Sequence, residues 1–492
     1  MEREGGPGLG CLAKPGATPW GSHDMRLRAP DGHCSPVPGL AARPTFRAFQ
    51  WRRRPKTNGM PASFIESGAS VMVRSSGRSW SKFLLVCSAL LLSACASPLA
   101  RRMRPVEALL REQVDAQKIP GAVVLLQRTD GSDSYVTAIG QMDREQGKAL
   151  REDALFRIAS MTKPITSVAV MMLVEEGKLG LEEPISKYLP EWGNVQVLAS
   201  PSASSTVPAQ TPITVRHLLT HTSGISYRFM GEPLGPLYQK AGIVDGFEHT
   251  SWTLADQSRA LASLPLEHQP GAAFTYGLNT DLLGYLVEQV SGVPLDRFFQ
   301  ERIFTPLGMK DTSFFPPEDE ASRLVALYRH ASSGALERVP ETGTNVVEGF
   351  FSYAPDFQTT GAKSYRSGGA GLVSTARDYA RFLQMLANGG KLGGARLLKR
   401  ETVEQMTRNQ IGALRADFYG SGFGLGFGVQ EDPALVKAQG PVGNYFWSGI
   451  FKSHAWVDPE HKLAGIIMIN LWDMASDTPN DIRARIYSAV EE

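Results

Sequence analysis

Ser160 and Lys163 stand three residues apart in the segment Ser160-Met161-Thr162-Lys163. Residues at this spacing share one face of a helix, so the lysine can lie beside the serine hydroxyl. A serine hydroxyl is a weak nucleophile until a neighbouring base takes its proton, and a desolvated lysine with a lowered pKa can assist. Pro164 has no amide hydrogen, which a helix tolerates only near its start, so Ser160 is expected at a helix N-terminus. The spacing indicates nucleophilic catalysis at Ser160.

The Ser-x-x-Lys spacing carries little weight alone, because it also occurs at Ser79–Lys82 and often describes a helix cap beside a solvated lysine. Further distinctive segments accompany Ser160 along the chain. They read HLLTHTSG at 217–224, FTYGLNTDLLG at 274–284, PLGM at 306–309, SGGAGLVST at 367–375 and WSG at 447–449.

In this order, the segments resemble the serine β-lactamase-like hydrolases, which include class C β-lactamases, D-alanyl-D-alanine carboxypeptidases and family VIII carboxylesterases. The resemblance runs from about residue 105 to the C-terminus. It implies an α+β fold of the β-lactamase/penicillin-binding-protein (transpeptidase) type. Both chain ends then share an antiparallel sheet, which is flanked by helices and carries an inserted, mainly helical subdomain. The resemblance makes Ser160 the nucleophile, Lys163 its partner and Tyr276 the general base.

The third motif of that family falls at Trp447-Ser448-Gly449, and the resemblance makes these three residues part of the oxyanion and substrate-binding site. The resemblance implies that this segment is an edge strand beside the nucleophile. The N–H groups of Ile450 and Ser160 would then stabilise the oxyanion, where losing one donor typically costs ~3 kcal/mol in the transition state.

Two departures from the family pattern bear on the substrate. Tyr276 is followed by Gly277 and Leu278, so Asn279 stands one place later than in the Tyr-x-Asn motif. Trp447 replaces the lysine of Lys-Thr-Gly, which removes a cation for a substrate carboxylate. Lys452 lies three residues beyond Gly449, and on a strand it would point to the opposite face. Trp447 resembles the Trp-x-Gly of family VIII esterases and offers an apolar wall for an acyl or alcohol group.

These features favour a serine hydrolase that cleaves carboxylic esters through an acyl-enzyme, with a small-molecule ester or β-lactam-like substrate and no metal or organic cofactor. A β-lactamase or D-alanyl-D-alanine carboxypeptidase is the alternative within the family, and acyl transfer to an alcohol or amine stays open. The alternative from another class is a catalytically idle envelope scaffold. Separately from that alternative, Tyr276 and Trp447 each have a structural interpretation, as a core aromatic ahead of a helix and as packing on a buried strand.

Other patterns favour structural roles. His217 and His221 have a metal-capable spacing, but no cluster of further ligands accompanies them. The glycine-rich run at 422–428 lacks the Lys-Ser/Thr ending of a phosphate loop, and no Gly-x-Ser-x-Gly elbow indicates a Ser-His-Asp hydrolase.

The front of the chain reads as a targeting segment. Basic residues precede a short apolar run in 72–94, which ends at Cys95 and resembles a bacterial lipoprotein signal. Cys95 would be lipidated, 95–104 would form a tether, and Ala96 favours the outer membrane, facing the periplasm. Residues 1–71 are expected to be disordered or untranslated, with translation starting at Met72.

Charge and cysteine counts exclude several classes of function. Residues 95–492 hold 38 basic and 44 acidic residues, which argues against a nucleic-acid partner. The four cysteines all lie at or before Cys95, so the domain at 105–492 has no disulfide and no thiolate site.

Hydrophobic periodicity predicts the elements that hold these residues. Strands are expected at 121–127, 135–140, around 444–457 and at 463–471, and a Ser/Pro/Ala-rich loop is expected at 193–212. Helices are expected at 105–119, 162–177, 215–220, 255–263, 281–290, 296–303, 376–387 and 480–490.

Overall fold

A computed structural model describes residues 97–491 except 201, 203–204, 417–421, 436–439 and 474–476. The segment 1–71, the signal at 72–94 and Cys95 lie outside the described residues. Within the described part of the chain, no helix is both long enough and apolar enough to cross a bilayer.

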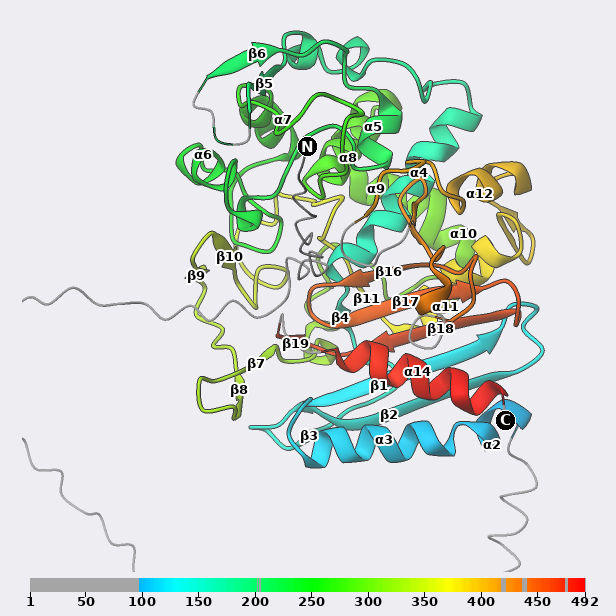
Figure 1. Cartoon of the computed structure of the whole chain (residues 1–492). Helices are drawn as coiled ribbons and strands as arrows, with labels where there is room; N and C mark the ends of the chain where they lie inside the picture. The colour runs from blue at the N-terminus through cyan, green and yellow to red at the C-terminus, as the bar shows by residue number, and fades with distance from the viewer. Residues whose placement is uncertain are drawn as a thin grey trace, which may run out of the picture. The chain divides into compact units, whose positions relative to one another are not determined.

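Both ends of the domain contribute to one eight-stranded antiparallel sheet, which confirms the predicted architecture (Figure 1). In β1, Val123 lies opposite Ala138 of β2 on one side and Met468 of β18 on the other. The strand order is β14 (Gly422–Phe423), β15 (Gly428–Val429), β16 (Tyr445–Gly449), β17 (Ser453–Asp458), β18 (Leu463–Met468), β1 (Gly121–Arg128), β2 (Ser134–Asp143) and β3 (Lys148–Ala149).

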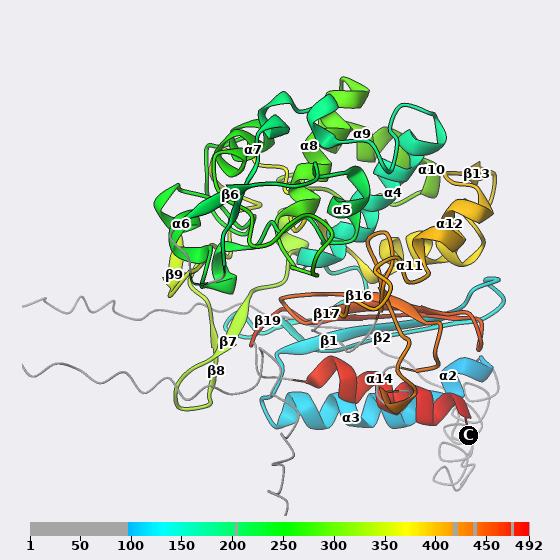
Figure 2. The ribbon, with the colours of Figure 1, turned by 45° about the horizontal axis from the view of Figure 1, so that its top comes forward.

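Helices cover both faces of this sheet, as Figure 2 shows. On one face lie α3 (Arg104–Asp115) and α14 (Thr478–Glu491), and on the other face α11 (Ala376–Ala387) contacts β1 and β18. Side chains alternate along a strand, so Val124 of β1 joins the core under α3 and α14, while Val123 joins the core on the α11 side. Burial of both faces explains why β1 is apolar almost throughout.

The helical subdomain surrounds α4 (Thr162–Glu175), which is buried from Thr162 to Leu173 and packs against α8 (Asn279–Ser291). A helix that is apolar on every side belongs in a core. The subdomain also contains α5 (Val215–Leu219), α6 (Gly235–Lys240), α7 (Leu254–Ala262), α9 (Leu295–Phe299) and α10 (Thr305–Leu307).

Several shorter elements differ from the sequence expectations. The region predicted as a loop contains a hairpin, β5 (Gln196–Leu198) with β6 (Thr206–Pro208). Residues expected in a tether form α2 (Pro98–Arg102), where Leu99 is buried. The remaining elements are β4 (Phe156–Arg157), β7 (Tyr328–His330), β8 (Leu336–Arg338), β9 (Val346–Glu348), β10 (Phe351–Tyr353), β11 (Val373–Ser374), β12 (Lys391–Leu392), β13 (Ala395–Arg396), α12 (Arg400–Met406) and β19 (Leu471–Trp472).

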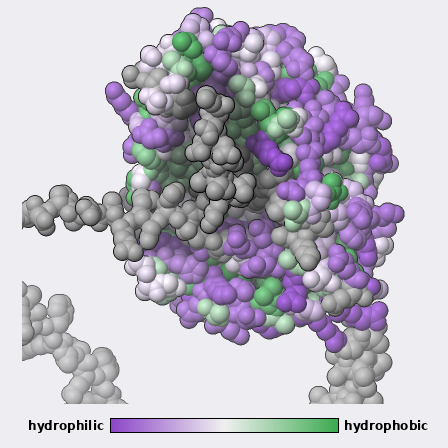
Figure 3. Space-filling model, in the orientation of Figure 1, coloured by the Kyte–Doolittle hydropathy of each residue, from purple (hydrophilic) through white to green (hydrophobic). Residues whose placement is uncertain are grey.

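Hydrophobic side chains on the face in Figure 3 are dispersed among hydrophilic ones. Scattered apolar residues of this kind are usual on a folded protein. The large hydrophobic residues that are exposed in the described chain are Val207, Leu237, Val347 and Val442.

Candidate active site

Ser160 lies in a single 3-10 turn, η1 (Ala159–Met161), which leads directly into α4. The residue before it, Ala159, has φ +44°, in the left-handed region that residues with a Cβ seldom adopt. This conformation costs on the order of 1 kcal/mol. Ala159 lies between β4 and α4, and the turn that it opens places Ser160 at the N-terminus of α4. There the helix dipole favours negative charge.

Lys163 is buried beside Ser160, in the position that the spacing predicted. Its Nζ donates to Ser160 Oγ at 3.1 Å, to Tyr227 OH at 2.8 Å and to the carbonyl oxygen of Gly369 at 2.9 Å. Burial disfavours the ammonium and lowers the pKa of Lys163 to about 7, while the charge of Asp281 acts in the opposite direction. Near neutral pH, a substantial fraction of Lys163 is therefore uncharged.

The three partners of Lys163 determine what its neutral form can do. The Gly369 carbonyl only accepts, so one N–H points to it in either protonation state. A neutral amine has two hydrogens and one lone pair, and its two other neighbours are the hydroxyls of Ser160 and Tyr227. The lone pair can accept a proton from either hydroxyl. This geometry suits a base for Ser160.

Two tyrosines, not one, lie beside Lys163. The Nζ is 4.7 Å from the ring centroid of Tyr276, and the rings of Tyr227 and Tyr276 are 5.4 Å apart. Tyr227 is fully buried, and its burial raises the pKa of the phenol well above its usual value. Tyr227 therefore remains a neutral phenol, whereas Tyr276 is only partly buried. The base role of Tyr276 stays a prediction.

Asp281 places a carboxyl group behind Lys163. It is fully buried on α8, and its Oδ1 accepts from Tyr365 OH at 3.1 Å. Burial raises the pKa of Asp281, while hydrogen bonds and the charge of Lys163 oppose that rise. The Asp281 charge in turn favours the ammonium form of Lys163.

Replacement of Asp281 by Asn is expected to move the acid limb of the kcat/KM pH profile to lower pH. The carboxylate raises the pKa of Lys163, so its loss lowers that pKa and populates the neutral amine at a lower pH. The profile of the variant against wild type between pH 5 and pH 9 measures the shift. A limb that moves upward, or does not move while the variant keeps its native melting temperature, contradicts this role.

The third motif lies in β16, directly against the nucleophile turn. β15 pairs only with Tyr445 and Phe446, so its pairing ends before Trp447 and only the second half of β16 fulfils the edge-strand prediction. A Cβ at Gly449 would overlap the carbonyl oxygen of Ile158, and η1 packs on β16. This close approach brings the turn that holds Ser160 against the strand that precedes Ile450. That their two N–H groups meet at this junction stays a prediction.

Gly449→Ala is therefore expected to force β16 away from η1. If both N–H groups bind the oxyanion, separating them should reduce kcat by about 10²-fold, the usual effect of losing one donor. Ester hydrolysis and melting temperature should be measured together. Gly394→Ala is the matched control, because position 394 has open space around it. Full activity in Gly449→Ala would contradict the proposed junction.

Trp447 packs mainly inside the protein. It is 5% exposed, and its ring lies 5.5 Å from that of Tyr276 and 5.2 Å from that of Phe423. It supports the ring of Tyr276 and leaves little surface for an acyl or alcohol group. Lys452 follows in the β16–β17 turn, where burial lowers its pKa and the carboxylates of Asp473 and Asp477 partly oppose that shift.

Asn279, which stands one place later than the asparagine of the Tyr-x-Asn motif, has a structural role. Its Nδ2 donates to His221 Nδ1 at 3.0 Å and to the Ile225 carbonyl at 3.3 Å, and its Oδ1 accepts from Ser223. A Cβ at Gly277 would overlap the Ile225 carbonyl. Asn279 therefore fixes the loop that carries Tyr276 against the His-Thr-Ser-Gly segment.

Both histidines considered as metal ligands have structural partners. His221 accepts from Gly277 and Asn279, and His217 Nδ1 accepts from Thr214 N at 3.2 Å in a helix cap. Among the described residues, no group of three or more His, Cys, Asp or Glu could hold a metal ion.

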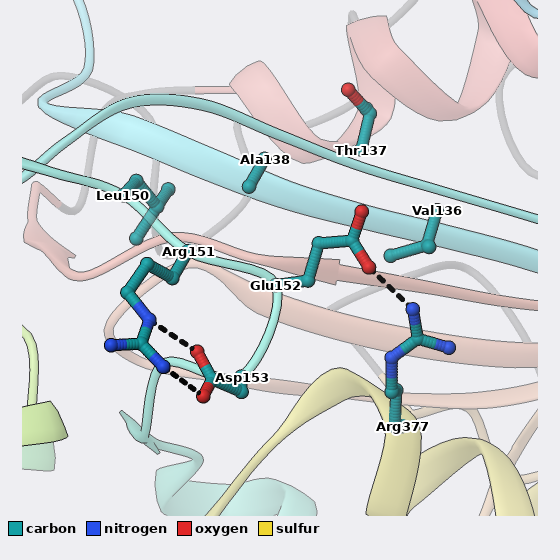
Figure 4. A pocket seen from close by; sticks show the side chains of 8 residues that line it. All are labelled: Val136, Thr137, Ala138, Leu150, Arg151, Glu152, Asp153 and Arg377. Atoms are coloured by element: carbon teal, nitrogen blue, oxygen red, sulfur yellow. Dashed lines mark hydrogen bonds and ion pairs between the residues drawn. The ribbon is translucent and has the colours of Figure 1, made fainter.

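A separate pocket, which Ser160 does not line, lies against β2 (Figure 4). Its charged side chains pair with one another, Arg151 with Asp153 and Arg377 with Glu152. The lining residues are Val136, Thr137, Ala138, Leu150, Arg151, Glu152, Asp153 and Arg377.

Sequence reasoning gave no role to three groups at the site: the Tyr227 hydroxyl, the Gly369 carbonyl and the Asp281 carboxyl. Gly369 and Asp281 lie within segments that carry the family resemblance, and Tyr227 follows the His-Thr-Ser-Gly segment by three residues. The available signal was the position of Gly369 and Asp281 within these segments and of Tyr227 shortly after one of them.

Comparisons with known proteins bear on the family of this chain. The sequence model of the beta-lactamase family matches residues 106–489. The chain belongs to this family. This beta-lactamase-family chain is a serine hydrolase with the fold expected from its sequence.

Similar proteins include esterases. Protein Rv1367c of Mycobacterium tuberculosis is 35% identical over 394 residues, which cover 77% of this chain and 92% of that protein. Esterase EstB of Burkholderia gladioli is 33% identical over 382 residues, covering 76% and 91%. The solved structure of EstCE1, a hydrolase with promiscuous acyltransferase activity, has a TM-score of 0.69 and 32% identity, and covers 80% of this chain and 98% of its own.

Proposed function

We propose that this beta-lactamase-family hydrolase cleaves carboxylic esters through an acyl-enzyme on Ser160. Ser160 Oγ attacks the ester carbonyl and loses its proton to the Tyr276–Lys163 pair. The ester C–O bond then breaks, and the alcohol leaves with that proton. Water attacks the acyl-enzyme, gives a proton to the same pair and releases the acid as Ser160 regains its hydrogen. The two steps consume one water for each ester.

The observation that carries this proposal is the contact between Lys163 Nζ and Ser160 Oγ at 3.1 Å, in a buried position that lowers the pKa of Lys163. A lysine that served only as a surface charge would be solvated and fully ionised. Burial of the amine against a hydroxyl, at the start of α4, provides both a base and an electrostatic environment for the oxyanion.

An ester is favoured over a β-lactam or a peptidoglycan stem by the third motif. Trp447 occupies the position of the lysine that provides a cation in β-lactamases. Lys452 is the next cation along the turn, and the carboxylates of Asp473 and Asp477 favour its charged form. EstB is named an esterase and EstCE1 a hydrolase, and each of them matches most of this chain.

The proposal is tested with p-nitrophenyl butyrate, nitrocefin and a D-Ala-D-Ala peptide on one preparation of the full chain. Ester turnover that exceeds nitrocefin and peptide turnover is expected, and the reverse order would support the β-lactamase or carboxypeptidase alternative. A fluorophosphonate probe should label Ser160. Folded protein that neither labels nor turns over any substrate would indicate the idle scaffold.

Tyr276→Phe is expected to reduce kcat/KM by about 10²-fold or more, in the usual range for loss of a general base. Tyr227→Phe should reduce kcat/KM much less. Tyr227 accepts a hydrogen bond from Lys163, but its raised pKa keeps it a neutral phenol that does not serve as the base. Kinetics of both variants on one ester decide between them. A larger loss in Tyr227→Phe would transfer the base role to Tyr227.

Acyl transfer is the second candidate, because EstCE1 combines its hydrolase function with a promiscuous acyltransferase activity. An alcohol would replace water at the second step and carry the acyl group away as a new ester. Adding methanol to the ester assay and measuring methyl butyrate against butyrate by chromatography distinguishes the two outcomes.

A further inference from the structure

Residues 243–248, between α6 and α7, form an irregular segment that is buried throughout. Buried backbone without regular secondary structure needs side chains to bind its N–H and C=O groups. Arg228 Nη1 donates to the Ile243 carbonyl at 3.0 Å, and the amide of Asp245 donates to Glu248 Oε1 at 3.1 Å. Side-chain contacts of this kind hold the 243–248 segment in place.

A buried ion pair links this segment to the loop that carries Tyr227. Arg228 Nη2 donates to both carboxylate oxygens of Glu248, at 2.9 and 3.0 Å, and Arg228 Nε donates to the Phe350 carbonyl at 3.0 Å. The Arg228 amide donates to Asp245 Oδ1 at 2.9 Å. Burial raises the pKa of Asp245 to about 8, while the charge of Arg228 opposes that rise. Near neutral pH the cluster therefore holds mainly one cation, one anion and one neutral acid.

On one side, this cluster fixes the hydroxyl of Tyr227. Tyr227 directly precedes Arg228, and its OH accepts from Lys163 Nζ at 2.8 Å. Its ring stacks on that of Phe229 at 4.6 Å, and the Phe229 ring lies 5.5 Å from that of Phe351. Arg228 thus stands between two residues whose rings pack on each other. Its guanidinium contacts fix the course of the chain through both.

On the other side, the 243–248 segment lies against the loop that carries the Gly369 carbonyl. Gly246 has φ +90°, and a Cβ at this position would overlap Ser367 Oγ. Ser367 begins the Ser-Gly-Gly sequence whose last carbonyl, that of Gly369, accepts from Lys163 Nζ at 2.9 Å. Two of the three hydrogen-bond partners of Lys163 therefore belong to loops that contact the segment held by this ion pair.

We propose that Arg228 and Glu248 are positioning residues that act on Lys163 through its hydrogen-bond partners. Their ion pair keeps the phenol and carbonyl acceptors in place, and these acceptors direct the amine toward the nucleophile. The inference rests on the proposed function, in which Lys163 belongs to the base. A buried ion pair loses much of its Coulomb energy to desolvation, so it contributes little net stability. A positioning role gives this pair a use.

Arg228→Lys tests the proposal, because lysine keeps the charge and loses the fork that reaches several acceptors at once. The Tyr227 hydroxyl is then no longer held as an acceptor for the Lys163 ammonium, so the pKa of Lys163 should fall. The acid limb of the kcat/KM profile should move about 0.7 pH units lower, which corresponds to a fivefold effect of one hydrogen bond. The substitution leaves unchanged the other titratable groups that face Lys163, namely Asp281, His221 and Tyr276.

A Tyr227→Phe background separates positioning from electrostatics. Arg228→Lys and Glu248→Gln should both move the acid limb in the wild-type background. In Tyr227→Phe they should lose most of that shift, because the acceptor on which they act is already absent. An effect of charge alone would persist there. Arg338→Lys is the matched control, because Arg338 also pairs with two carboxylates; it should lower the melting temperature without moving the limb.

The titration of Lys163 can also be measured without substrate, by ¹³C NMR of the full chain with labelled lysine and with Lys163→Met to assign the signal. Wild-type protein that hydrolyses no ester, with a Lys163 titration that moves in Arg228→Lys, would overturn the proposed function alone. Wild-type hydrolysis with an unmoved limb and titration in folded Arg228→Lys would overturn this inference alone. If Arg228→Lys does not fold, the same measurements on Glu248→Gln decide, and an unmoved limb there overturns the inference.

Discussion

Ser160→Ala is expected to reduce kcat/KM for p-nitrophenyl butyrate by about 10⁴-fold or more, as for other serine hydrolases that lose their nucleophile. The substitution removes the only atom that forms the acyl bond, while the oxyanion donors and the substrate contacts remain. KM should change little, and the loss should appear in kcat. Spectrophotometric turnover at saturating ester measures the effect.

The same preparation should lose fluorophosphonate labelling and keep its melting temperature, because the Ser160 side chain contributes one hydrogen bond to Lys163. Ser333→Ala is a suitable control, since Ser333 is exposed on the β7–β8 hairpin. Ester turnover that survives in Ser160→Ala would place the chemistry elsewhere and remove the basis for the acyl-enzyme.

Lys163→Met is expected to lower kcat/KM by about 10³-fold or more, because neither Ser160 nor Tyr276 then has a base or a charge beside it. Lys163→Arg separates these two roles. A guanidinium preserves the positive charge and cannot be deprotonated. If the neutral amine is required, Lys163→Arg should be as inactive as Lys163→Met.

The pH profile provides the independent check on Lys163. Burial lowers the pKa of Lys163 to about 7, so the neutral form increases as pH rises through 7, and kcat/KM should rise with it. Substantial activity in Lys163→Arg, together with a flat profile between pH 6 and pH 8, would show that Lys163 acts only as a cation.

Local patterns predicted the long elements well. The helix expected at 376–387 is α11 at the same bounds, and α4 and α8 lie within a few residues of their predicted ranges. The β5–β6 hairpin escaped prediction because its Ser-, Pro- and Ala-rich sequence lacks the alternation of a half-buried strand. The strand region expected around 444–457 divides into β16 and β17, where Lys452 adopts φ +64° in the turn.

In the site, too, the sequence predicted the contact that depends on local spacing and missed those between distant residues. The contact between Ser160 and Lys163 follows from three-residue spacing, which is a local property of a helix start. The contacts of Lys163 with Tyr227 and Gly369 join residues 64 and 206 positions apart, and no local pattern specifies such a pairing. The resemblance pointed to these segments, but only the fold shows that a backbone carbonyl and a second phenol surround the amine.

The pairing of β1 with β18 has a consequence for how the protein is made. β1 leaves the ribosome 335 residues before the first residue of β18 emerges, so its partner edge stays open throughout that interval. At usual elongation rates the wait is on the order of 20 to 70 s. β16, which packs on the turn around the nucleophile, begins 285 residues after Ser160. A nascent chain therefore exposes Ser160 well before β16 has been synthesised and can pack against the turn that holds it.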